Sequence, residues 1–127
     1  MTQRRTLAAV ALVSLTAGAG AMWAQQQAQQ SRREPQFENA EMKTWKSVVM
    51  PKQPLTLHRH EHGRALVALT DGELDVVDKN GKKLNQYDLK AGHAIWLSKD
   101  PPGQMHADVN PGTKPVEVIV VELKNDK

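Results

Sequence analysis

The amino-acid sequence predicts a single all-β domain, a barrel or sandwich of short strands that follows an N-terminal signal segment. The chain has 127 residues, which suits one domain. From residue 42 onward, short apolar-rich runs alternate with turn signals, and no stretch keeps a helical period without a Gly or Pro. The runs predict about eight strands, at 42–50, 55–60, 64–69, 73–78, 83–89, 93–97, 105–110 and 116–123.

Residues 1–24 have the composition of a signal peptide. Arg4 and Arg5 form a basic start, residues 7–15 are an apolar run, and residues 16–24 are small and rich in Gly and Ala. The apolar run is about half of the roughly 20 residues that a membrane span needs, so no stable span is expected in the mature form. We expect cleavage after Ala24, with Ala21 as the alternative, and export by the general or the twin-arginine route to the periplasm or the medium.

Residues 25–36 follow the signal and contain six glutamines, a cluster of charged residues and Pro35. Such a segment buries too little apolar surface to offset the entropy lost on ordering. The sequence therefore predicts a disordered, glutamine-rich tether over 25–36, and a folded domain over 37–127.

Two features of the predicted strands carry further expectations. Asn80 and Gly81 are the residues that a type I′ hairpin turn prefers, because both tolerate a positive φ. The last strand, 116–123, is apolar at six of its positions and across both faces at its centre. This pattern predicts a central strand or a subunit interface, and we expect a homodimer.

Composition excludes several classes of function. The chain has no cysteine, which rules out disulfides and thiolate metal sites. The net charge is +3, and it falls to +1 once Arg4 and Arg5 are removed with the signal. So small a charge does not support nucleic-acid binding. No nucleotide-binding glycine loop or hydrolase triad is present.

The histidines are the strongest functional signal in the sequence. His58, His60 and His62 alternate with other residues, and in a strand residues two apart project from the same face. One metal ion could therefore be held by His58 and His60, and His62 is the preferred candidate for a further ligand if the strand continues. The alternative is a solvated loop that binds no metal. His93 fits no such pattern and is expected to have no ligand role.

Two motifs give the chain a resemblance to the cupin family. The first cupin motif, HxH(x4)E(x6)G, matches at His58, His60 and Gly72. The second ends PxG(x2)H(x3)N, and it matches at Pro101, Gly103, His106 and Asn110. The chain departs from the family at the glutamate of the first motif, where Ala65 stands.

The resemblance implies a single cupin-type jelly-roll barrel of about eight antiparallel strands. It also implies that His58, His60 and His106 bind one divalent transition metal ion inside the barrel, with His62 close by. The metal would be Fe, Mn, Ni, Cu or Zn. Three neutral imidazoles suffice for such an ion and leave coordination positions open.

Two functions of different kinds fit this resemblance. The first, which we favour, is an exported small cupin-domain protein that binds a divalent metal, a small molecule or both without catalysis. The second is a metal-dependent cupin oxygenase with a three-histidine site. One fold hosts many chemistries, so whether the protein is an enzyme stays open at this stage.

Overall fold

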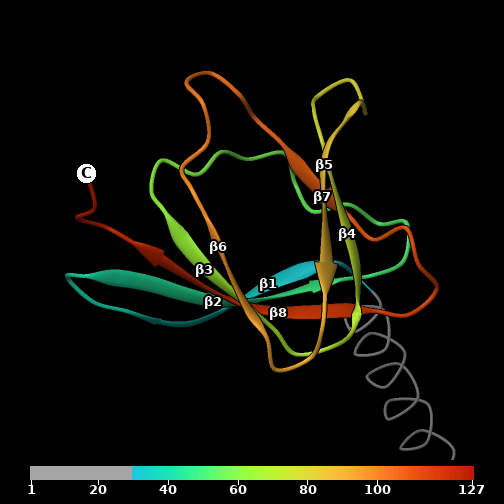
Figure 1. Cartoon of the computed structure of the whole chain (residues 1–127), viewed down its shortest axis with the longest axis horizontal. Coiled ribbons are helices and arrows are strands. Elements are labelled where there is room, and N and C mark those ends of the chain that lie inside the picture. The colour runs from blue at the N-terminus through green and yellow to red at the C-terminus, as the bar shows by residue number, and fades with distance from the viewer. Residues whose placement is uncertain (1–29) are drawn as a thin grey trace, which may run out of the picture. The chain divides into compact units, whose positions relative to one another are not determined.

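The computed structural model describes residues 30–127, and in them the chain folds into eight strands arranged as two antiparallel sheets (Figure 1). The all-β prediction is confirmed. The strands are β1 Arg32–Glu38, β2 Met42–Val49, β3 Arg64–Ala68, β4 Gly72–Val77, β5 Lys83–Leu89, β6 Ala94–Leu97, β7 Ala107–Val109 and β8 Val116–Leu123. Within this described part, no helix is long and apolar enough to cross a membrane.

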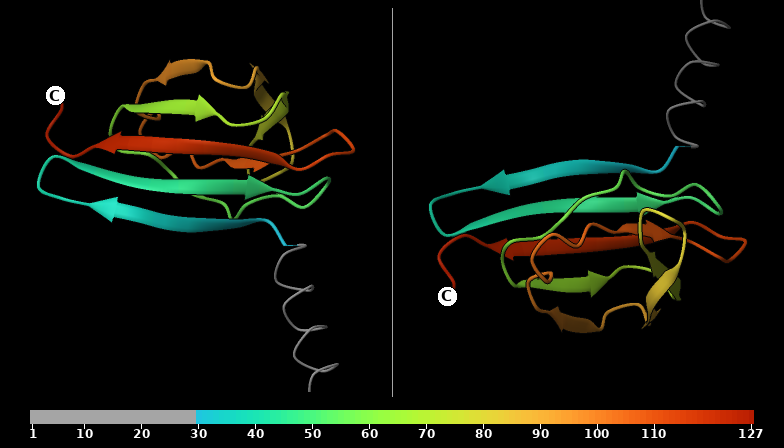
Figure 2. Two further views of the ribbon diagram at one scale, coloured as in Figure 1. Left: turned by 90° about the horizontal axis from the view of Figure 1, so that it is seen from below. Right: turned by 90° about the horizontal axis from the view of Figure 1, so that it is seen from above.

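The larger sheet has the strand order β1-β2-β8-β3-β6, and the smaller has the order β5-β4-β7. The C-terminal β8 thus lies between β2 and β3, which agrees with the first of the two alternatives that its apolar pattern predicts, a central strand. Figure 2 shows β1, β2 and β8 side by side along the molecule. This topology joins the start and the end of the described chain in one sheet.

The hydrophobic core lies between the two sheets and is built mainly from aliphatic residues. In β3, and in β8 as far as Val120, every second residue is buried, as expected for strands with one face toward a core. The buried residues of the core are Trp45, Val49, Leu55, Leu66, Ala68, Leu74, Leu89, Val116, Val118 and Val120. Residues 31–127 form one compact unit around this core.

Strand β1 corrects the predicted tether. It pairs with β2 from Arg32↔Val48 to Glu38↔Lys43, with a bulge between Pro35 and Phe37. The expectation of disorder is therefore wrong for residues 32–36, because an edge strand is held by backbone hydrogen bonds and does not need an apolar side-chain pattern. The rest of the tether up to residue 29, and the predicted signal peptide, lie outside the described residues.

The prediction of a strand at 55–60 is wrong. The backbone of this segment follows β7 through isolated contacts, the last of which is a bridge between His58 and His106 with two N–H···O bonds of 2.8 Å. Pro51 and Pro54, which precede the segment, lack the N–H that a regular ladder needs, and the His60 N–H donates to the Asp100 side chain, so no continuous ladder forms. This irregular path brings His58 alongside His106.

The hairpin between β4 and β5 forms at the predicted place with a different turn. Gly81 has a φ of 81°, but Lys52 is the only non-glycine residue in the described part with a positive φ, so Asn80 does not adopt the type I′ geometry. The Gly81 N–H donates to the Asp78 carbonyl oxygen at 3.0 Å. A three-residue loop that ends on a left-handed glycine fits these bonds.

Gly72, the glycine of the first motif, begins β4 beside the core. Its φ is 151°, and a Cβ at this position would lie 2.7 Å from Cγ2 of the buried Val116. The position therefore excludes a side chain because β4 must pass close to β8. The motif glycine thus sets a packing distance and lies apart from the histidines.

Candidate metal centre

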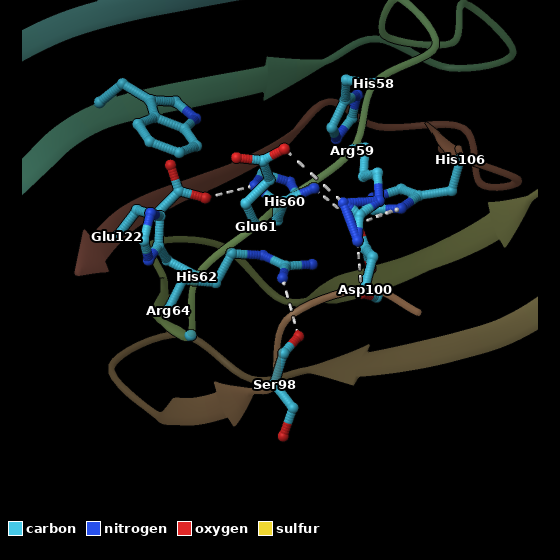
Figure 3. Close-up of polar contacts among 12 residues, drawn as sticks. His58, Arg59, His60, Glu61, His62, Arg64, Ser98, Asp100, His106 and Glu122 are labelled. Carbon is cyan, nitrogen blue, oxygen red and sulfur yellow. Dashed lines mark hydrogen bonds and ion pairs between the residues drawn. The ribbon is translucent and has the colours of Figure 1, made fainter. Parts of the chain in front are cut away.

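Three histidines from two segments meet at one point in the barrel (Figure 3). His58 and His60 come from the irregular segment before β3, and His106 directly precedes β7. Their possible ligand atoms lie within 4.8 Å of one another. The ring centroids are 4.7 Å apart for His58 and His60, 4.4 Å for His58 and His106, and 5.4 Å for His60 and His106. The structure therefore brings together the three residues that the motifs indicate.

Each of the three imidazoles has an acceptor oxygen near its Nδ1 atom. These acceptors are the Thr56 carbonyl for His58 at 2.6 Å, the Glu122 carboxylate for His60 at 2.6 Å, and the Asp100 carboxylate for His106 at 3.1 Å. An acceptor at Nδ1 favours the tautomer that carries its hydrogen there. The lone pair at Nε2 is then available, which is the usual arrangement of a histidine that binds a metal.

The Nε2 atoms of His58 and His106 are buried and have no hydrogen-bond partner. Leaving a buried polar atom unpaired costs about 1–3 kcal/mol. A metal ion between the rings would satisfy both atoms, so the residues present fit a divalent transition metal ion. Imidazole is a ligand suited to zinc, copper, iron and nickel.

Burial keeps two of the imidazoles in the ligating, neutral form. It lowers the pKa of His58 to about 4, and it also lowers the pKa of His106, in spite of the raising effect of Asp108 and Asp100. Burial by itself would raise the pKa of Glu122. The hydrogen bond and attraction of His60 outweigh that effect, so the Glu122 carboxyl has a lowered pKa and stays ionised at neutral pH.

His62, the predicted additional ligand, does not join the other three. Its Nδ1 lies 2.7 Å from Oδ1 of Asp126, whose Oδ2 accepts the Gly63 N–H at 2.7 Å. The chain bends at residues 61–62, so the strand alternation on which the prediction relied does not hold there. Glu61 is exposed and points toward Arg59 at 3.9 Å. His93 is exposed at the start of β6, away from the cluster.

Ala65, which stands where the first motif has its glutamate, faces away from the core. In β3, Arg64, Leu66 and Ala68 are buried, whereas Ala65 alternates with them and pairs with Trp96 and Val121. Arg64 is the β3 residue that faces inward near the site. It is 4% exposed and donates from Nη1 to the Ser98 carbonyl oxygen at 3.2 Å.

Sequence reasoning missed the acidic residues around the histidines. Asp100 directly precedes the Pro101 of the second motif, and its Oδ2 also accepts the His60 N–H at 2.7 Å. Asp108 lies two residues after His106, and its Oδ2 is 3.6 Å from Nε2 of His58. These two are close to a motif and could have been found from it. Glu122 is 62 residues from His60 in the chain, and no local pattern points to it.

Asn110, the last residue of the second motif, has a structural role. It is 1% exposed, and its Nδ2 donates to the carbonyl oxygens of Val49 at 2.9 Å and Lys114 at 2.7 Å. Its Oδ1 accepts the Gly112 N–H at 2.9 Å. Asn110 therefore ties the end of β7 to β2 and to the following turn.

A cavity of about 420 Å³ opens beside the histidines, and His58 and His60 form part of its wall. Strand β1 and the start of β2 form another part of the wall, through residues that include Arg33, Phe37 and Trp45. A volume of this order suits a small organic molecule. The site thus combines a cluster of metal-ligand atoms with space for a ligand.

Comparison with known proteins agrees with this architecture. The cupin-domain family model matches residues 45–122, which is more than half of the chain, and the chain therefore belongs to the cupin family. None of the curated proteins matches it significantly.

Solved structures show the same fold. A cupin domain from Bordetella pertussis Tohama I is similar with a TM-score of 0.63 and 21% identity, over 75% of this chain and 94% of that one. A Cupin 2 conserved barrel domain protein from Salinispora arenicola is similar with a TM-score of 0.53 and 24% identity, over 75% and 76%. An RmlC-like cupin with a double-stranded β-helix fold from Methanocaldococcus jannaschii gives 0.57 and 13%, over 75% and 81%.

Proposed function

We propose that this protein is an exported, non-catalytic cupin-domain protein that binds one divalent transition metal ion through His58, His60 and His106. A small molecule would bind in the adjoining cavity. The observation that carries the proposal is that the buried Nε2 atoms of His58 and His106 have no hydrogen-bond partner and lie in rings that converge with His60. Bound there, a metal ion would supply a Lewis acid and a positive charge beside the cavity.

The carboxylates of Glu122 and Asp100 suit a binding role. Glu122 and Asp100 are each engaged by an imidazole, and Asp100 also accepts a backbone N–H. A general base must be free to reach the proton that it removes. These two carboxylates instead orient ligands, which suits a protein that holds a metal ion.

Metal titration of single alanine variants tests the proposal. We expect stoichiometric binding of at least one of Fe, Mn, Ni, Cu and Zn to the wild type in titration calorimetry, with elemental analysis of the native protein naming the ion. His58→Ala, His60→Ala and His106→Ala should each abolish stoichiometric binding. His93→Ala is the matched control and should bind as the wild type does. Binding that survives in the triple alanine variant would refute the proposed site.

Export is part of the proposal and is supported by the signal-like composition of residues 1–24. Mass spectrometry of the protein isolated from its native cells should give an N-terminus near residue 25. An intact Met1 on the major species would contradict export through a cleaved signal.

We also propose that the protein is a homodimer that pairs through the outer face of its larger sheet. On that face β3 and β8 present Ala65, Val67, Ile119 and Val121, and β6 adds Trp96, which is 57% exposed. An apolar sheet face of this kind is covered by a partner in many proteins. Light scattering should give twice the protomer mass, and Val67→Lys should shift the protein to monomers. A wild type that is monomeric at tens of micromolar would contradict this assembly.

A further inference from the structure

The wall of the cavity beside the histidines combines an apolar surface with an excess of free positive charge. Its two carboxylates are already paired, Glu38 with Lys124 at 2.9 Å and Glu122 with His60 at 2.6 Å. Its guanidinium from Arg59 is held by the carbonyl oxygens of Pro101 and Asp100 at 3.3 and 3.1 Å. The charged groups that remain available to a ligand are therefore cations.

Among the described residues, Arg33 and Lys43 are the cations of this wall that form no ion pair with a carboxylate, and Arg33 is the one that contacts an aromatic ring. It lies on β1, opposite Ser47 of β2, and its guanidinium carbon is 5.4 Å from the centroid of the Trp45 ring. Across residues 30–127 no carboxylate forms an ion pair with it, although Asp108 and Glu122 attract it from a greater distance. The contact with the indole ring holds the guanidinium at the cavity wall. Its N–H donors are not bound to a carboxylate of the protein and could bind an anionic ligand.

The charges around the site favour an anion once a metal is bound. Six charged side chains surround the imidazoles, namely Arg33, Arg59, Arg64, Asp100, Asp108 and Glu122. Their formal charges cancel. A divalent metal ion would leave an excess of +2 in a partly enclosed space, where electrostatic attraction for an anion is stronger than in water.

We propose that this cavity binds a small organic carboxylate, with the carboxylate on the Arg33 guanidinium and the apolar part against Pro35, Phe37 and Trp45. A planar guanidinium matches a carboxylate with two parallel hydrogen bonds. Phe37 is 54% exposed, so its ring offers apolar surface to a ligand. The inference deepens the proposed function, because the metal charge strengthens the site and the same cavity holds the ligand.

Titration with benzoate and benzamide tests the inference, because the two probes have nearly the same shape and differ in charge. Binding is followed by ligand-observed NMR and calorimetry on the mature protein, both free of metal and loaded with zinc. We expect benzoate to bind the zinc-loaded protein at least tenfold more tightly than benzamide does. Arg33→Gln should lower the benzoate affinity at least tenfold. Arg33→Lys should have an affinity between those of Arg33→Gln and the wild type.

Arg32→Gln is the matched control. Arg32 precedes Arg33 on the same strand, and it pairs with Glu34 at 3.0 Å. Benzoate affinity should therefore be unchanged in this variant. Thermal melting of each variant separates a loss of binding from a loss of fold.

Three results with the carboxylate and amide probes would overturn the carboxylate site. These are equal affinities for benzoate and benzamide, an unchanged benzoate affinity in Arg33→Gln, and no detectable binding of benzoate or hexanoate at 10 mM. Inorganic phosphate that binds Arg33 more tightly than either carboxylate would also overturn it. A failure of the metal site is seen separately, as the absence of zinc binding, and the carboxylate titration can still be made on the metal-free protein.

Discussion

His60 and His106 are oriented by carboxylates at their Nδ1 atoms, and this is where single residues have the largest effect on the site. The Glu122 oxygen lies 2.6 Å from Nδ1 of His60, and the Asp100 oxygen lies 3.1 Å from Nδ1 of His106. Such partners hold the ring and its tautomer in place and raise the basicity of the ligand nitrogen. The affinity of the proposed metal site is therefore expected to depend also on residues that would not contact the ion.

Replacing Glu122 tests this dependence. We expect Glu122→Ala to weaken metal binding by roughly 10- to 100-fold, because the His60 ring loses the acceptor that orients it. Glu122→Gln keeps an acceptor oxygen without the charge and should fall between Glu122→Ala and the wild type. Glu117→Ala is the control on the same strand, since Glu117 pairs with Lys46 on the other face. Equal metal affinities in all four proteins, measured by competition with a chelator, would show that Glu122 has no such role.

The lowered pKa of His58 predicts a loss of stability in mild acid. Its folded-state pKa is about 4, against an ordinary value of 6.5, so between these values the unfolded chain binds a proton that the folded chain does not. The free energy of unfolding of the metal-free protein should therefore fall as the pH drops from 6.5 to 4. The contribution of His58 is at most about 3 kcal/mol. Urea denaturation across this pH range measures the free energy of unfolding, and its dependence on pH should be weaker in His58→Gln. An equal pH dependence in that variant would show that another group causes the loss of stability.

At the scale of the elements, the approach of β4 to β8 and the edge position of β1 decide the geometry of the barrel. Gly72 lets β4 start against Val116, which closes the two sheets over the core. Strand β1 extends the larger sheet by one strand and carries Arg33 to the cavity. Both features act through packing and backbone pairing.

Two glycine substitutions separate the cost of contact with Val116 from the cost of backbone strain. Gly72→Ala should destabilise the fold by roughly 2–4 kcal/mol, because a Cβ would lie 2.7 Å from Val116 and the φ of 151° strains an alanine. Gly92→Ala also sets an alanine at a positive φ, 84°, but meets nothing within 4 Å, so about 1–2 kcal/mol is expected. Chemical denaturation gives both values. Similar losses in the two variants would mean that contact with Val116 costs nothing.

At the scale of the whole molecule, the metal site joins segments that are distant in the chain. His58 and His60 precede β3, His106 precedes β7, and Glu122 lies on β8. An ion bound by the three histidines would therefore connect the two sheets and stabilise the complete domain.

Zinc should accordingly raise the melting temperature. At a free zinc concentration of one hundred times Kd, a ligand that binds only the folded state adds about 2.7 kcal/mol. For a domain of this size, that corresponds to a rise of at least about 10 °C. Scanning calorimetry with and without zinc measures the shift, and the His106→Ala variant should show none. A wild-type melting temperature that zinc leaves unchanged would exclude linkage between binding and folding.

The fold class and the histidines of the candidate site were predictable from short sequence patterns and from the resemblance to the cupin motifs. Turn residues and apolar runs are local signals, so they predict strands and a central β8 without knowledge of the tertiary structure. The spacing of His58 and His60 is local in the same sense. His106 is joined to them only through the resemblance to the second cupin motif, because nothing in the positions of the three residues alone links it to the other two.

Several of the side chains that surround the histidines could not be predicted from the sequence, because they come from distant segments. Glu122 contacts His60 although the two are 62 residues apart in the chain. Arg33 reaches the cavity from an edge strand that is mostly polar and shows no regular alternation of apolar residues. His62 shares the spacing of the other histidines, yet a bend in the chain directs it to Asp126. Strand alternation holds only where the backbone is a regular strand, and contacts between distant segments depend on how the sheets pack; neither property is encoded in local spacing.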